Sequence, residues 1–134
     1  MKPSMLDTDM LSEFLRGNPG VIAKVDEHLM EYGYISLSII TYYEILNGLL
    51  YKDARKQLTR FEAFVALNKV IPLTLRMAKA AAVIQADLRK KGTEIGHTDT
   101  LIAGIAITSG LQLVTNNTGH FKRIKGLDIE NWTN

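Results

Sequence analysis

The segment of residues 96–107 constrains the fold most, because one carboxylate, that of Asp99, stands near the start of an otherwise apolar run. The run is too short to cross a bilayer, so the sequence predicts a buried helix with Asp99 in its first turn. Thr98 is the expected N-cap, and Ser109-Gly110 is the expected end. A helix without a polar face must be covered by other elements on most sides.

No basic side chain lies near Asp99 in the sequence. The dipole of the helix favours the ionised carboxylate, and a charge at the mouth of a buried helix needs a counter-charge. A divalent metal ion would supply it. The alternative is that Asp99 only caps the helix, which is a common role for an aspartate in the first turn.

Length and composition indicate one globular domain that spans residues 1–134. A chain of this size buries roughly two thirds of its unfolded surface, and its 46% apolar and 22% charged residues are typical of folded proteins. The sequence contains no cysteine, which excludes disulfides and thiolate metal sites. No run resembles a signal peptide or a membrane span, so we expect a cytoplasmic protein without membrane contact.

The net charge of +2 is too small to identify a nucleic-acid-binding protein by itself. Two basic groups flank the central helix in the sequence, Lys90-Lys91 before it and Lys122-Arg123 with Lys125 after it. Both could lie near the N-terminal end of that helix. Exposed surface charges without a function would give the same pattern.

Short apolar segments alternate with amphipathic segments along the chain, which is typical of a parallel α/β sheet. We predict a single α/β domain whose central, mostly parallel sheet of about four to five strands is covered by helices on both faces. Pro72 favours an edge position for the strand that contains it. The strands are expected at residues 5–6, 34–37, 70–73, 111–115 and 127–130, and the helices at 10–15, 21–32, 39–51, 52–65, 75–91 and 98–107.

Four carboxylates, those of Asp7, Asp9, Glu44 and Asp99, lack a basic neighbour in the sequence and could meet at one edge of the sheet. Asp7 and Asp9 follow the first strand, and sites in open α/β sheets lie outside the carboxyl ends of the strands. Carboxylates that converge must bind protons or cations, and oxygen ligands favour Mg²⁺ or Mn²⁺ over zinc. The histidines have no ligand spacing and are expected to be structural or exposed: His28, His97 and His120.

Four short motifs occur in order along the chain: Asp-Thr-Asp at 7–9, Ser-Ile-Ile-Thr-Tyr-Tyr-Glu at 38–44, Gly-His-Thr-Asp-Thr-Leu-Ile-Ala at 96–103, and Leu-Val-Thr-Asn-Asn-Thr at 113–118. Together they resemble the motifs of PIN-domain ribonucleases, and most closely those of the VapC toxins of toxin–antitoxin pairs. The resemblance covers essentially the whole chain. It implies a single PIN domain that cleaves RNA with Mg²⁺ or Mn²⁺, is usually dimeric and is kept inactive by a cognate antitoxin.

The same resemblance implies an acidic core of Asp7, Glu44 and Asp99 that binds the metal and carries catalysis. Asn117 stands where relatives have a fourth Asp or Asn, and Asp9 stands where they commonly have Asn. Both are therefore further candidates for metal ligands. His120 stands where an acidic residue is common, which removes a negative charge beside the site.

The expected mechanism uses one or two Mg²⁺ ions, held by Asp7 and Asp99 with Glu44 bound directly or through water, to deliver hydroxide to a phosphodiester. Phosphate contacts would set affinity without setting sequence preference. The candidates for such contacts are two threonines and four basic residues: Thr8, Thr115, Arg16, Lys91, Lys122 and Arg123.

The helices expected between residues 39 and 65 carry more large apolar side chains than one side of a small sheet can cover. Either these side chains form an ordinary core, or part of them faces a partner such as an antitoxin helix in a hydrophobic groove. The side chains are Tyr42, Tyr43, Leu49, Leu50, Tyr51, Phe61 and Phe64.

Two other functions are compatible with this sequence. Asp7-Thr8-Asp9 after an apolar strand also resembles the start of haloacid-dehalogenase-type phosphatases, in which the first aspartate is a nucleophile. Met10 stands where that family has Thr or Val. The third alternative is a module without catalytic activity that keeps the acidic residues for metal binding or for its fold.

Overall fold

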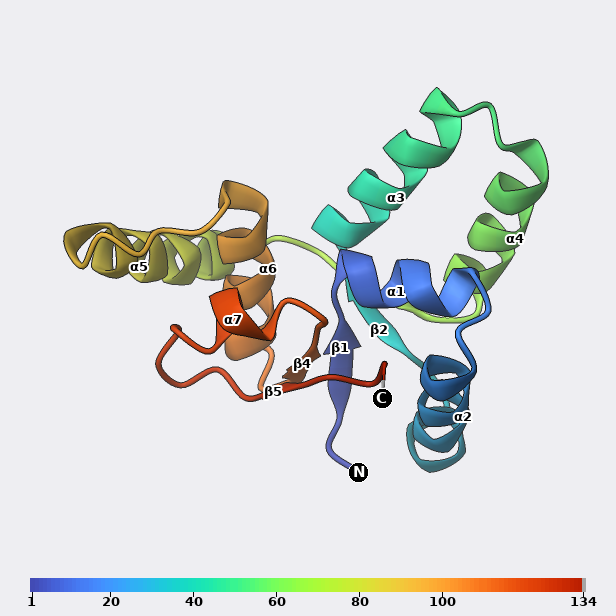
Figure 1. Ribbon diagram of the computed structural model, residues 1–134, viewed down its shortest axis with the longest axis horizontal. Coiled ribbons are helices and arrows are strands. Elements are labelled where there is room, and N and C mark those ends of the chain that lie inside the picture. Colours follow the sequence, from blue (N-terminus) through green and yellow to red (C-terminus); the bar gives the residue numbers. More distant parts are fainter. Residues whose placement is uncertain (134) are drawn as a thin grey trace.

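The chain folds around one parallel sheet, seen in a computed structural model that describes residues 1–133 (Figure 1). Its five strands are all parallel and lie in the order β3-β2-β1-β4-β5, which confirms the predicted sheet and the edge position of the Pro72 strand. The elements are β1 (Ser4–Leu6), α1 (Thr8–Leu15), α2 (Pro19–Tyr32), β2 (Ser36–Ser38), α3 (Ile39–Tyr51), α4 (Arg55–Ala66), β3 (Lys69–Ile71), α5 (Leu75–Lys90), α6 (His97–Thr108), β4 (Gln112–Val114), α7 (Thr118–Phe121) and β5 (Ile129–Glu130).

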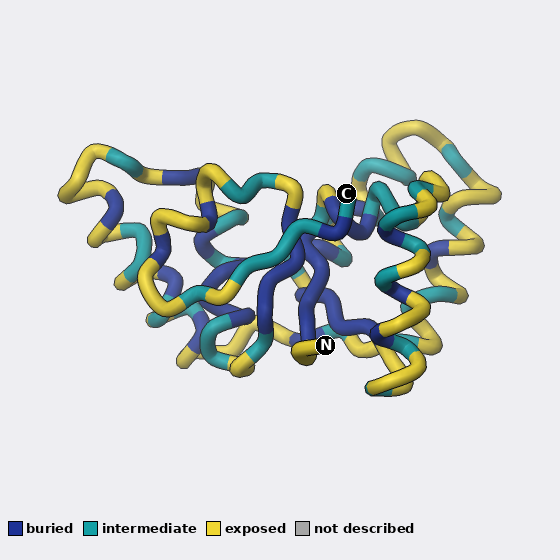
Figure 2. Tube along the Cα trace, turned by 60° about the horizontal axis from the view of Figure 1, so that its bottom comes forward, coloured by how far each residue is buried: buried dark blue, intermediate teal, exposed yellow. Residues whose placement is uncertain are grey.

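Successive residues of the central strands face opposite sides of the sheet, as the two-residue period of a strand requires. Met5 packs into a core with α5, α6 and α7, whereas its neighbour Leu6 packs into a second core with α1 to α4. Leu113 and Val114 of β4 divide in the same way. Figure 2 shows the resulting buried centre between largely exposed helices, and helices on both faces confirm the prediction.

Helix α6 is the buried helix that residues 96–107 predict. Ile102, Ile105 and Ala106 are almost fully inaccessible to solvent, and the helix ends at Ser109 as expected. The expected N-cap was wrong: Thr98 is the second residue of the helix, and Gly96 caps it without a side-chain hydrogen bond. No helix within residues 1–133 is long and apolar enough to cross a membrane.

Most other elements begin or end within two residues of the expected positions, and three differences are informative. β2 begins two residues later than predicted, at Ser36. α4 begins at Arg55 rather than at residue 52, because Asp53 has a positive φ of 52° and interrupts the helical backbone between α3 and α4. A single helical turn, α7, forms where only a turn was expected.

The close packing of α5 on α6 depends on Gly104. A Cβ atom at this position would lie 2.7 Å from the Met77 carbonyl oxygen and 3.0 Å from the Ala81 Cβ atom. We therefore expect Gly104→Ala to lower the free energy of unfolding by about 2 kcal/mol or more in urea titrations, because the helices must separate. Gly48→Ala in α3 is the matched control, since nothing lies within 4 Å of its Cβ position. It should stabilise the protein by about 0.5–1 kcal/mol, and equal effects of both substitutions would contradict the close approach.

Candidate active site

The Asp7 carboxylate lies where β1 passes into α1. Its Oδ1 accepts a hydrogen bond from the Met10 amide at 2.8 Å and so caps α1, while its own amide donates to the Val114 carbonyl of β4 at 3.0 Å. The Thr115 side chain, which follows β4, also hydrogen-bonds to this carboxylate. Asp7 is only 4% exposed. The carboxyl ends of two neighbouring strands therefore fix this side chain at the edge of the sheet where the sequence predicts it.

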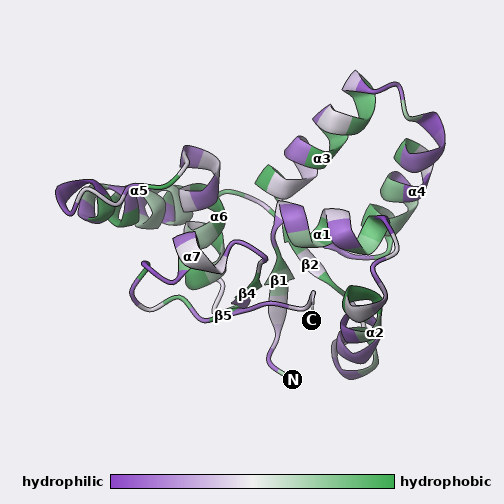
Figure 3. Ribbon diagram, viewed as in Figure 1, coloured by the Kyte–Doolittle hydropathy of each residue, from purple (hydrophilic) through white to green (hydrophobic). Residues whose placement is uncertain are grey.

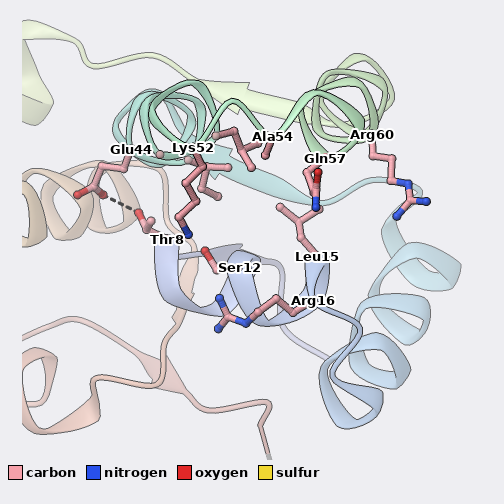
Figure 4. A pocket seen from close by; sticks show the side chains of 12 residues that line it. Thr8, Ser12, Leu15, Arg16, Glu44, Lys52, Ala54, Gln57 and Arg60 are labelled. Carbon is pink, nitrogen blue, oxygen red and sulfur yellow. Dashed lines mark hydrogen bonds between the residues drawn. The ribbon is translucent and has the colours of Figure 1, made fainter.

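Glu44 reaches the same edge from α3. Ser38 caps this helix through a hydrogen bond from the Thr41 amide at 3.1 Å. The Thr8 hydroxyl donates to Glu44 Oε1 at 2.6 Å and lies 3.1 Å from the Thr41 hydroxyl oxygen, so α1 and α3 meet through these side chains (Figure 4). One Glu44 oxygen is thus held by Thr8, the residue that follows Asp7 in the sequence.

Asp99, in the first turn of α6, is near the other carboxylates. Burial raises the pKa of Asp99, as do the negative charges of Glu44 and Asp9, and His120 opposes the rise. Burial also raises the pKa of Asp7 to about 6, against its hydrogen bonds, with smaller contributions from Asp9 and Asp99. The four predicted carboxylates therefore lie close enough to repel one another.

None of these four carboxylates forms an ion pair with a basic side chain within residues 1–133. They are not drawn together into a closed ligand shell either, since no group of three His, Cys, Asp or Glu side chains in that range has the arrangement of a metal site. The donor set nevertheless fits a hard divalent cation, because it offers carboxylate oxygens that no lysine or arginine pairs with in the described chain.

The histidines divide into three cases. His28 is structural, as expected: it is buried, Nε2 accepts from the Ser4 amide at 3.1 Å, and Nδ1 bonds to the Tyr34 carbonyl at 3.0 Å. Burial lowers the pKa of His28, which suits a neutral ring. His97 is exposed. His120 is exposed too, but its charge acts on Asp99, so it lies beside the site.

Asn117, the candidate fourth member of the acidic core, lies between β4 and α7. The side-chain nitrogen Nδ2 of Asn117 is 2.9 Å from His120 Nδ1, and its backbone N–H donates to the Thr115 hydroxyl at 2.9 Å. Thr115 is fully buried and holds both Asp7 and this loop. It is therefore a positioning residue, and the expectation that it contacts RNA phosphates was wrong because its hydroxyl is engaged inside the protein.

The four basic candidates occupy different places. Arg16 pairs with Glu13 and lines a cavity that it shares with Thr8 and Glu44. Lys91 pairs with Asp87 at 3.2 Å beyond the end of α5, which is the outer end of the molecule in Figure 1. Lys122 and Arg123, which follow α7, are both exposed. Arg123 donates a hydrogen bond to the carbonyl of Thr93, just before α6, at 3.4 Å. Of this group, Arg16 shares a cavity with a site carboxylate, that of Glu44, whereas Arg123 lines a different hollow between α5 and the region after α7.

That cavity measures about 380 Å³ and runs between α1, α3 and α4 (Figure 4). Thr8 and Glu44 stand at one end of it, and Arg60 stands at the other. Ile45 and Leu49 supply part of an apolar wall. The sequence could not reveal this cavity, because its walls come from three helices whose relative placement no local pattern encodes.

The large apolar side chains of α3 and α4 serve both as core and as surface. Phe61 is fully buried and stacks with Tyr42 at 5.6 Å between ring centroids. Tyr43, Leu50 and Tyr51 are 64%, 57% and 90% exposed, and Figure 3 shows hydrophobic segments along α3 as far as its C-terminal end. Part of this apolar surface is thus ordinary core and part is exposed to solvent, and the contact of the exposed part with a partner stays a prediction.

The buried charge of Asp7 predicts a pH-dependent stability in metal-free buffer. Its folded-state pKa of about 6 exceeds the ordinary value of 3.8, so the stability that Asp7 contributes is fully present below pH 3.8 and is lost as the pH rises to about 6. Asp7→Asn keeps an N-cap oxygen but cannot ionise. With EDTA at pH 7.5 it should exceed the wild type in unfolding free energy by on the order of 3 kcal/mol, and at pH 3.8 the difference should shrink towards zero.

Urea titrations at the two pH values measure this difference. Asp26→Asn, an exposed position on α2, is the matched control and should change stability little at either pH. A gain for Asp7→Asn that is the same at both pH values would contradict the origin in ionisation.

Comparison with known proteins places the chain in a family. The model of the PIN domain matches residues 4–127. The chain is 32% identical to a tRNA(fMet)-specific endonuclease VapC of Shigella flexneri, over 96% of this chain and 97% of that protein. The protein of the same name from Salmonella typhimurium is 33% identical, over 96% of each chain.

Solved structures agree with these relatives. DNA-bound VapBC of Salmonella typhimurium superposes with a TM-score of 0.88 at 31% identity, over 98% of this chain and 99% of that chain. VapBC2 of Rickettsia felis, bound to a promoter DNA fragment, gives a TM-score of 0.86 at 29% identity, over 96% and 98% of the two chains. The Asp-Thr-Asp motif thus belongs to this fold and not to a haloacid-dehalogenase-type phosphatase. The chain belongs to the PIN domain family.

Proposed function

We propose that this protein is an endoribonuclease toxin that hydrolyses RNA phosphodiester bonds with Mg²⁺ or Mn²⁺. The observation that carries the proposal is the group of four mutually repelling carboxylates without a basic partner at the carboxyl edge of the parallel sheet. Relatives in the same family are named ribonucleases or endonucleases, which supports the proposal as well. Two of them are named as specific for tRNA(fMet), which makes a tRNA the first substrate to test.

Asp7, Asp99 and Glu44 are the residues that would hold the cation, and Asp9 and Asn117 are further candidate ligands. When bound, the cation would supply Lewis-acid stabilisation of the phosphoryl oxygens and would lower the pKa of a water bound to it. Thr8 orients Glu44 through its 2.6 Å hydrogen bond.

Thr115 and the Met10 amide keep the Asp7 carboxylate in place. The attacking water oxygen forms the new bond to phosphorus while the bond to the departing strand oxygen breaks. The proton of the attacking water would pass to the carboxylate cluster or to solvent, and a solvent water would supply the proton that the departing oxygen takes.

Substitution of the acidic core tests this function directly. Asp99→Asn should lower the rate of cleavage of a labelled tRNA in Mg²⁺ by at least about 100-fold, because it removes a charged ligand without changing side-chain size. Asp26→Asn on α2 should retain full activity, and EDTA should abolish cleavage by the wild type until Mg²⁺ or Mn²⁺ is restored in excess.

Calorimetric titration of Mn²⁺ supplies a second measurement, in which Asp99→Asn should bind more weakly than Asp26→Asn. Cleavage that Asp99→Asn and EDTA both leave intact would refute the metal-dependent assignment. Mn²⁺ binding without any RNA cleavage would instead support the module without catalytic activity.

We also propose that an antitoxin protein binds this chain and that the exposed end of α3 is part of the contact. Similar structures were solved as VapBC or FitAB, which supports a protein partner. Large apolar side chains are exposed at three positions of this one helix: Tyr43, Leu50 and Tyr51. Isolated exposed apolar residues are common in folded proteins, but a group of them is typical of an interaction surface. An amphipathic helix of the partner would cover such a surface. We also propose that the chain forms a homodimer or a larger assembly.

Replacement of these apolar side chains should separate partner binding from catalysis. The double variant Leu50→Gln/Tyr51→Gln should bind the protein encoded beside this one at least about tenfold more weakly in calorimetry, with RNA cleavage unchanged. Met30→Gln on α2, at a side chain that is 91% exposed, is the matched control and should bind normally. Wild-type affinity in the double variant would remove α3 from the interface.

A further inference from the structure

The cavity between α1, α3 and α4 is acidic at one end and basic along the rest of its length. Glu44 is its only acidic lining residue within residues 1–133. Three basic residues line it as well: Arg16 from the region after α1, Lys52 after α3, and Arg60 in α4. The cavity therefore leads from the carboxylate cluster into a positively charged passage.

Two of these cations are available to a ligand. Lys52 and Arg60 are exposed, and neither forms an ion pair with another side chain in the part of the chain that the structure describes. Arg16 already pairs with Glu13. In Figure 4 the amino group of Lys52 and the guanidinium of Arg16 both point towards Ser12, in the middle of the passage.

The basic surface continues past the cavity. Arg60 also lines a shallow hollow on the outer side of α4, together with Arg55, Lys56 and Thr59. The segment from Lys52 to Arg60 carries four cationic side chains and one anionic one, Asp53, which pairs with Arg55. Cations thus follow one another from beside Glu44 to the outside of α4.

We propose that Lys52 and Arg60 bind phosphates of the RNA strand that leads into the acidic site. This proposal rests on the ribonuclease function proposed above. The carboxylates attract a metal ion but repel a polyanion, so the substrate needs a compensating positive surface close to them. The ammonium of Lys52 and the planar guanidinium of Arg60 both donate well to phosphate oxygens, and the apolar wall between them brings no further negative charge.

The test is the double variant Lys52→Gln/Arg60→Gln, compared with Arg76→Gln/Lys79→Gln. The control pair removes the same charge from exposed positions on α5, on the other face of the sheet (Figure 1). The Lys52/Arg60 variant should raise KM for RNA cleavage about tenfold at physiological salt and leave kcat within about twofold, because phosphate contacts away from the reacting atoms bind substrate and transition state alike. The control pair should change neither value.

A binding measurement keeps the proposal separate from catalysis. Fluorescence anisotropy with a labelled single-stranded oligoribonucleotide in EDTA should show weaker binding by the Lys52/Arg60 variant alone. Its slope of log affinity against log salt should fall by about 1.4, the value for two lost phosphate contacts on a single strand. Binding can be measured even if the wild type does not cleave RNA. Absence of cleavage would refute the proposed ribonuclease function but not the proposed phosphate contacts.

Two results would overturn the proposal. One is equal RNA binding and equal KM for the two double variants. The other is unchanged RNA binding by the Lys52/Arg60 variant with weaker binding of the partner protein, which would assign these cations to an acidic protein segment.

Discussion

The burial of the Asp7 carboxylate without a cationic partner is the constraint on which the rest of the site depends. The Met10 amide, the Thr115 side chain and the N-terminus of α1 stabilise its charge, yet burial still raises its pKa to about 6. Repulsion from Asp9 and Asp99 adds to this cost. A fold that needed only stability would place a neutral cap here, so the arrangement indicates a site built for a positive ligand.

Much of the fold could be predicted from the sequence, because its signals are local. Short apolar runs identify the strands, and α3 and α5 begin at the expected residues 39 and 75, where Ser38 and Thr74 cap them. The parallel order follows from the alternation of strands and helices. Two of the errors are at helix ends, where backbone geometry decides: Gly96 in place of Thr98 as N-cap, and the left-handed Asp53 before α4.

The carboxylates of the site could also be predicted, since Asp7 follows a strand and Asp99 starts a helix, and both positions fall at the carboxyl edge of the sheet. The effect of the His120 charge on Asp99 could not be predicted, because it depends on where α7 lies relative to α6. Thr115 looked like a surface hydroxyl in the sequence and is instead buried against Asp7. Such contacts arise through space between segments without a shared periodicity, so no sequence pattern contains them.

The cavity between α1, α3 and α4 has its acidic and basic side chains at different places, and this arrangement bears on regulation. Lys52 caps the C-terminal end of α3, directly after the exposed Leu50 and Tyr51, so the apolar surface proposed for a partner adjoins the basic entrance proposed for RNA. A protein that covers the end of α3 would therefore obstruct the passage without reaching any carboxylate. Inhibition then requires neither displacement of the metal ion nor a change of fold, because occupancy of one entrance excludes the substrate by volume and by charge.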